Sequence, residues 1–143
     1  MIAVDTNLLV YAHRQDSPFF ARATSALEQL VHDEAEWAVP WPCIHEFLAT
    51  VTRRRITPNP TPVETALAQV TALLEIPNLR TLSEGPTHLA TLSTIVSAAG
   101  FTGGAIHDAR IAAICLDHGV RELWTADRDF LRIPRLRTRN PLA

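Results

Sequence analysis

The sequence predicts an α/β fold with a central, mostly parallel sheet of four to five strands and helices on both of its faces. Short apolar runs of strand length alternate with longer segments in which apolar residues recur every three or four positions. Such alternation is typical of parallel strands joined by crossover helices. With 47% hydrophobic and 20% charged residues, residues 1–143 are expected to form one domain whose core needs no disulfide.

The elements of the first part follow from local patterns. Residues 2–4 are a short apolar run and predict the first strand. Apolar positions at helical spacing predict a helix at residues 19–31. Residues 37–41 predict the second strand, and Pro42 suits the first turn of a helix that runs to about residue 54.

The alternation continues after a proline-rich loop at residues 57–62, which is expected to be extended because each proline restricts the residue before it. Glycines are expected to end two of the later helices, since glycine readily adopts the left-handed conformation of a helix end. The predicted elements are a helix at 63–74, a strand at 79–82, a helix around 89–99 ending at Gly100, a helix at 105–118 ending at Gly119, a strand at 122–126 and a short strand at 136–138.

Four carboxylates fall where an open α/β sheet binds its ligands, outside the carboxyl ends of the strands. Asp5 ends the first strand and Asp127 ends the fourth. Glu46 lies in the opening turns of the helix after the second strand, and Asp108 lies in the first turns of a later helix. Gathered at one rim, these acids would repel one another unless a cation lay between them. Hard oxygen ligands favour Mg²⁺ or Mn²⁺, and one or two ions are predicted.

Each acid alone also has a purely structural interpretation. Asp5 could cap a turn, and Asp127 could cap the turn that follows it. Glu46 and Asp108 could be stabilised by the dipole at a helix N-terminus. The position of all four at one rim is what favours the metal site.

Several classes of protein are disfavoured because residues or motifs that they need are missing from the chain. All 13 basic residues are arginine, so receiver domains, haloacid-dehalogenase-type phosphatases and P-loop proteins, which use a lysine, are disfavoured. No Gly-x-Ser-x-Gly motif is present, which disfavours the usual serine hydrolase. The N-terminus lacks the pattern of a signal peptide, no segment is apolar enough to span a membrane, and a cytoplasmic protein is expected.

Arginines gather at residues 53–55 and again at residues 128–139. They can be solvated surface faces. The alternative is that they bind phosphate, because a guanidinium group donates two parallel hydrogen bonds to phosphate oxygens.

Four motifs in order resemble a PIN domain, and specifically a VapC-type toxin of a bacterial toxin–antitoxin pair. They are Asp5-Thr6-Asn7 after an apolar strand, the helix bearing Glu46, the helix that reads Asp-Ala-Arg-Ile-Ala-Ala from Asp108, and the segment Thr-Ala-Asp-Arg-Asp-Phe from Thr125. The resemblance spans the chain, and none of the four acids is missing.

This resemblance implies a PIN-like three-layer sandwich and a metal-dependent endoribonuclease that hydrolyses RNA phosphodiester bonds. It also implies a type II toxin, inhibited by a cognate antitoxin, that forms a homodimer. On this chain the catalytic metal ligands would be Asp5, Glu46, Asp108 and Asp127. The supporting polar residues would be Thr6, Asn7, Thr125 and Asp129. Charge placement adds four arginines expected to bind RNA phosphates: Arg110, Arg128, Arg132 and Arg135.

Two other functions stay open at this point. A catalytically silent PIN-fold protein-binding module would bind metal without turnover. A small-molecule phosphohydrolase would cleave a simple phosphate ester and leave RNA intact. His45 and His107 each precede one of the acids, but neighbours on a helix point about 100° apart, so both are expected to be supporting or packing residues.

Overall fold

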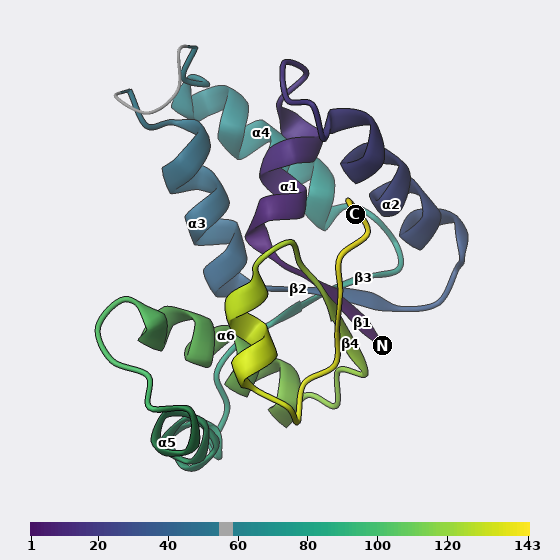
Figure 1. Ribbon diagram of the computed structural model, residues 1–143. Helices are drawn as coiled ribbons and strands as arrows, with labels where there is room; N and C mark the ends of the chain where they lie inside the picture. The colour runs from purple at the N-terminus through teal and green to yellow at the C-terminus, as the bar shows by residue number, and fades with distance from the viewer. Residues whose placement is uncertain (55–58) are drawn as a thin grey trace.

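Five short strands form one sheet in the order β3-β2-β1-β4-β5 (Figure 1). They are β1 (Ile2–Val4), β2 (Trp37–Pro40), β3 (Leu79–Leu82), β4 (Glu122–Trp124) and β5 (Thr138–Arg139). Every neighbouring pair is parallel, and Ala3 of β1 stands opposite Ala38 of β2 and Leu123 of β4. The predicted α/β class with a parallel sheet is confirmed.

The structure, a computed structural model, describes residues 1–54 and 59–143. Arg55 of the first arginine cluster and the beginning of the proline-rich loop, Thr57 and Pro58, lie outside the described residues. Within the described ranges, no helix combines the length and the apolar character needed to cross a lipid bilayer.

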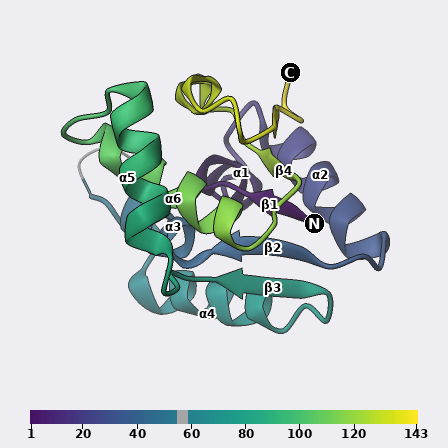
Figure 2. The ribbon, with the colours of Figure 1, turned by 90° about the horizontal axis from the view of Figure 1, so that it is seen from below.

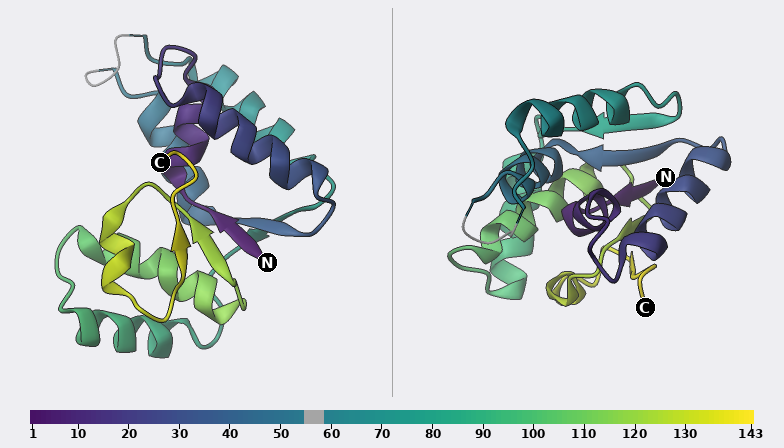
Figure 3. Two further views of the ribbon diagram at one scale, coloured as in Figure 1. Left: turned by 45° about the vertical axis from the view of Figure 1, so that its right-hand side comes forward. Right: turned by 90° about the horizontal axis from the view of Figure 1, so that it is seen from above.

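Helices cover both faces of the sheet (Figures 2 and 3). The four that connect β1 to β2 and β2 to β3 lie on one face, and the two that connect β3 to β4 lie on the other. This division follows from the right-handedness of parallel crossovers, because the chain moves outward to β3 and then returns across β1 to β4. The helices are α1 (Thr6–His13), α2 (Phe20–His32), α3 (Trp41–Val51), α4 (Val63–Leu74), α5 (His88–Ala99), α6 (Ala105–Asp117) and the 3₁₀ helix η1 (Arg128–Arg132).

The core lies between the sheet and its two helical layers. Trp37, Trp124 and Phe130 are the largest fully buried side chains. Burial of one large apolar side chain contributes about 2–3 kcal/mol to folding, so these three residues anchor the sheet on both sides of β1. Gly100 has φ +66°, the left-handed conformation expected where α5 ends.

Several elements differ from the sequence predictions. The helix predicted to run to about residue 54 ends at Val51. Helix α1 was not predicted, although it is the element that directly follows β1. The strand predicted at residues 122–126 ends at Trp124, so Asp127 lies three residues beyond β4 instead of ending it. The strand predicted at residues 136–138 is shifted to Thr138–Arg139, because the backbone N–H of Leu136 bonds to the carbonyl of Ile133 in a turn.

Candidate active site

The predicted acids meet at the carboxyl ends of β1 and β4, in a cleft of about 280 Å³. Asp5, Glu46, Asp108 and Asp127 all line this cleft, together with Thr6 and Asn7. A larger cavity of about 450 Å³, mostly apolar, lies between α1, α2 and α4, and none of the predicted site residues lines it. The chemistry therefore gathers in the smaller cleft.

Asp5 is almost fully buried, with 4% of its surface exposed. Its Oδ1 accepts hydrogen bonds from the backbone N–H of Thr6 at 2.8 Å and from the thiol of Cys43 at 3.5 Å. Its Oδ2 accepts from the hydroxyl of Thr125 at 2.7 Å and from Nδ2 of Asn7 at 3.3 Å. Burial raises the pKa of Asp5, while the bonds from Thr125, Thr6 and Cys43 act in the opposite direction. Asp5 also caps α1, so its structural interpretation and its place in the cleft coexist.

The hydroxyl of Thr125 connects both sides of this rim. It donates to Asp5 and accepts from Nδ2 of Asn7 at 3.2 Å and from the backbone N–H of Asp127 at 2.9 Å. Oδ1 of Asn7 in turn accepts from the backbone N–H of Ala126 at 3.1 Å. Residues that are about 120 positions apart in the sequence are thereby fixed to one another.

Glu46 is exposed on the first turns of α3. Its Oε2 accepts a hydrogen bond of 2.8 Å from the hydroxyl of Thr6. Thr6 therefore contacts two of the acids, Asp5 through its backbone and Glu46 through its side chain.

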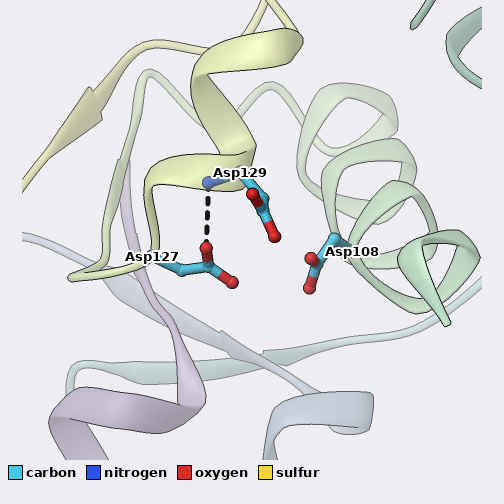
Figure 4. A group of neighbouring side chains, drawn as sticks. All are labelled: Asp108, Asp127 and Asp129. Carbon is cyan, nitrogen blue, oxygen red and sulfur yellow. Dashed lines mark hydrogen bonds between the residues drawn. The ribbon is translucent and has the colours of Figure 1, made fainter. Parts of the chain in front are cut away.

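Asp108, Asp127 and Asp129 form the tightest acidic group of the site (Figure 4). One carboxylate oxygen of each lies within 4.8 Å of one from each of the other two. Oδ1 of Asp127 accepts a hydrogen bond of 2.9 Å from the backbone N–H of Asp129 and so caps η1. Asp129, expected only as a supporting residue, thus stands beside two of the predicted ligands, whereas Asp5 and Glu46 are not members of this group.

The site carries an excess of negative charge. Partial burial, followed by the charges of Asp127, Asp5, Asp129 and Glu46, raises the pKa of Asp108 to about 7. Of the described residues that line the cleft, none is basic. Several carboxylate oxygens around one space, without a basic side chain to offset them, fit a divalent cation such as Mg²⁺ or Mn²⁺.

Without metal, the protein is expected to lose stability as the pH rises. The pKa of Asp108 in the folded state, about 7, lies above its ordinary value of 3.8, so the folded state binds more protons between these limits. The resulting stabilisation is complete below the ordinary value and is lost as the pH rises through the folded value. Thermal unfolding in EDTA should therefore show a lower Tm at pH 8 than at pH 5.5. The fall should be smaller in Asp108→Asn, and an equal fall in both proteins would contradict the prediction.

The four arginines expected to bind RNA differ in their surroundings. The guanidinium of Arg110 pairs with Glu84. Arg132 donates to the carbonyl of Ala99 at 2.7 Å and lies over the ring of Phe101. Arg128 and Arg135 are exposed. The structure thus gathers the acids in one cleft but spreads the arginines over several places.

Sequence reasoning missed two contributions to the site. The thiol of Cys43 contacts Asp5 from α3, and Val10 and Tyr11 of α1 line the cleft. The signal for α1 was present in the sequence, because an aspartate before an apolar run is a typical helix N-cap.

Comparisons with known proteins show the family of this chain. Residues 2–136 match the family model described as PIN domain. The chain is 37% identical over 142 residues to ribonuclease VapC43 of Mycobacterium tuberculosis, a match that covers 99% of this chain and 96% of the relative. It is 33% identical over 141 residues to ribonuclease VapC25 of the same species, with 99% of each chain covered.

Solved structures show the same fold. VapBC2 from Rickettsia felis, bound to a DNA fragment from its promoter, aligns with a TM-score of 0.71 and 20% identity over 98% of each chain. VapC20 of Mycobacterium tuberculosis, described as a toxin that cleaves the sarcin-ricin loop, aligns with a TM-score of 0.70 and 14% identity over 92% of this chain and 93% of that one. At these identities the likeness concerns the fold.

Proposed function

The chain belongs to the PIN-domain family and has full-length relatives among the VapC ribonucleases, and from this premise we propose that it is a metal-dependent endoribonuclease. It would hydrolyse RNA phosphodiester bonds as the toxin of a type II toxin–antitoxin pair. The observation that carries the proposal is the gathering of Asp5, Glu46, Asp108 and Asp127 in one cleft.

In this proposal the four acids hold one or two Mg²⁺ or Mn²⁺ ions. Bound there, such an ion would polarise the scissile phosphate and make water a stronger acid, so that a nucleophile is available near neutral pH. The carboxylates hold the ion and do not attack the phosphate themselves. A carboxylate and a phosphate are both anions, so they would repel each other. Asp129 is a supporting residue whose carboxylate is close enough to Asp108 and Asp127 to share their charge balance.

The supporting polar residues hold the buried Asp5 more firmly than the exposed Glu46. Asp5 cannot turn away from the cleft without breaking its bonds to Thr125 and to the backbone of Thr6. Among the described residues, the Glu46 side chain bonds only to the hydroxyl of Thr6, so it is freer to adjust to a substrate. A rigid inner acid and an adjustable outer acid suit a site that must admit an RNA strand.

The partners in this proposal are RNA and a cognate antitoxin. The solved structures of this fold include VapBC complexes, such as the one from Rickettsia felis, which supports an antitoxin as the partner of this chain as well. The proposal includes a single PIN domain over residues 1–143, a homodimer, as the resemblance implies, and a cytoplasmic location, where RNA targets and an antitoxin would be found.

The purified protein, freed of antitoxin, is expected to cleave total cellular RNA when Mg²⁺ or Mn²⁺ is added and to stop when EDTA is in excess. The metal requirement follows from the all-carboxylate cleft. Gel analysis of the RNA over time would measure the cleavage. Asp5→Asn is expected to lose it, and the exposed Asp33→Asn serves as the matched control.

Three outcomes would contradict this function. Cleavage by Asp5→Asn equal to that of the parent protein would place the activity elsewhere. Binding of metal without turnover on any RNA would favour the protein-binding module. Hydrolysis of a simple phosphate ester, with RNA left intact, would favour the small-molecule phosphohydrolase.

A further inference from the structure

A further cavity, of about 250 Å³, adjoins the acidic cleft between α3 and α6. Glu46 lines both the cleft and this cavity, so the two are neighbours along one wall. The residues that line the cavity lie on one face of each helix, at spacings of three or four positions. They are Pro42, His45, Glu46 and Ala49 from α3, and His107, Arg110 and Ile111 from α6.

Arg110 is held in place by Glu84, which follows β3. Its Nε donates to Oε1 of Glu84 at 2.8 Å, and its Nη2 lies 2.8 Å from the same oxygen. The hydrogen bond from Arg110 lowers the pKa of Glu84, so the pair stays ionised. The Arg110 side chain remains 37% exposed, and no described residue accepts from its Nη1. The cavity therefore carries a preorganised guanidinium with donor capacity to spare.

Two imidazoles accompany this guanidinium. The ring of His45 lines the cavity and lies 5.9 Å from the ring of Trp41, at a tilt of 32°, outside the cavity lining. Neither the imidazole of His45 nor that of His107 has a hydrogen-bond partner among the described residues, and both residues are exposed. Flat rings with unused ring nitrogens, beside a guanidinium, are the chemistry that binds bases and phosphates of single-stranded RNA.

An RNA strand that enters the acidic cleft needs basic groups next to the cleft to bind its phosphates. The cleft itself has no basic lining residue among those described, and the RNA backbone is an anion. Of the four arginines expected to bind RNA, only Arg110 lines either of these two cavities. Arg132 already bonds to Ala99 and packs on Phe101.

We propose that this cavity is a nucleotide subsite for single-stranded RNA, adjacent to the position of the scissile phosphate. Arg110 binds a backbone phosphate there, and His45 and His107 contact the attached base or ribose. The inference rests on the proposed ribonuclease function and adds to it the side of the cleft along which the strand runs.

The test measures RNA binding separately from cleavage. Short fluorescein-labelled single-stranded RNAs of mixed sequence are titrated with the full chain in EDTA, and binding is followed by fluorescence anisotropy. The subsite variants are Arg110→Gln and the double variant His45→Ala/His107→Ala. Arg80→Gln removes an arginine that is also paired with a glutamate but lies at the edge strand β3, and His32→Ala removes an exposed histidine of α2. Both serve as matched controls.

The dissociation constant is expected to rise roughly tenfold in each subsite variant and to stay within about twofold in the controls. For Arg110→Gln, the slope of log binding constant against log salt should fall by about one, and Arg110→Lys should restore part of the affinity. In Mg²⁺, Arg110→Gln should raise KM and leave kcat within about twofold, because the group binds substrate away from the reacting bond.

Binding by both subsite variants equal to that of the controls would overturn the subsite, as would absence of RNA binding by the parent protein. If one subsite variant fails to fold, the other decides the question. Weakened binding in these variants, together with no cleavage by the parent protein under any metal condition, would support the subsite and overturn the nuclease function alone.

Discussion

Replacement of Asp108 by asparagine is expected to lower the rate of RNA cleavage by about a thousandfold, equivalent to roughly 4 kcal/mol of transition-state stabilisation. Asp108 is the acid on which the charges of Asp127, Asp5, Asp129 and Glu46 converge, and a neutral amide there weakens the hold on a divalent cation. The repulsion between Asp108 and these acids predicts that the same variant, although less active, is more stable without metal. In EDTA at about pH 8, the variant should melt at a higher temperature than the parent protein.

Asp117→Asn provides the matched control for this variant. Asp117 lies on the same helix, outside the cleft, where it accepts a hydrogen bond from Thr91. The Asp117→Asn variant should cleave RNA at nearly the parental rate. Added Mg²⁺ should raise the Tm of the control and of the parent protein, and should raise that of Asp108→Asn much less. Equal cleavage by the Asp108 variant, or an equal response to Mg²⁺, would contradict the metal site.

Replacement of Thr125 by valine is expected to damage stability and activity together. Thr125 is 3% exposed, so the variant leaves the Asp5 carboxylate and the backbone N–H of Asp127 without their bonds to its hydroxyl, in a buried place. The free energy of unfolding should fall by about 2 kcal/mol. Cleavage should fall by between about 10-fold and 100-fold, as when a metal ligand loses the group that orients it.

The pH profile separates this role from a merely structural one. The hydrogen bond from Thr125 lowers the pKa of Asp5, so its loss lets that pKa rise further. Cleavage by Thr125→Val should then recover in part as the pH increases, while Thr125→Ser, which keeps the hydroxyl, should follow the parent profile. A uniform loss of activity at every pH in the valine variant would leave Thr125 with a packing role only.

The sequence predicted the sheet and most of its helices because the patterns that it carries are local. Apolar runs and helical spacing reflect burial, and burial decides where the elements of this fold lie. Helix α1 was not predicted because it is only eight residues long and begins at Thr6, directly after the strand. No loop separates the strand pattern from the helix pattern. The end of β4 was placed too late because the β-branched Thr125 and the apolar Ala126 are compatible with a strand, although Thr125 already directs its hydroxyl to Asp5.

The grouping of acids at one rim could be expected from topology, since all parallel strands end on the same side. The finer arrangement could not. The closeness of Asp129 to Asp108 depends on the turn of η1, and the contact of Cys43 with Asp5 depends on the depth at which α3 packs. Both are set by tertiary packing, and no periodicity in the chain encodes them. The cavity proposed as a nucleotide subsite likewise arises only where the faces of α3 and α6 meet.

The central position of β1 also bears on when during synthesis the site can exist. Strand β1 receives one neighbour from residues 37–40 but its other neighbour only from residues 122–124. Asp5 acquires its bond from Thr125, and the cleft its Asp127, only after residues 125–127 have been translated. A nascent chain that has not reached residue 108 thus lacks two of the four acids, and the site becomes complete only after residue 127 has been added.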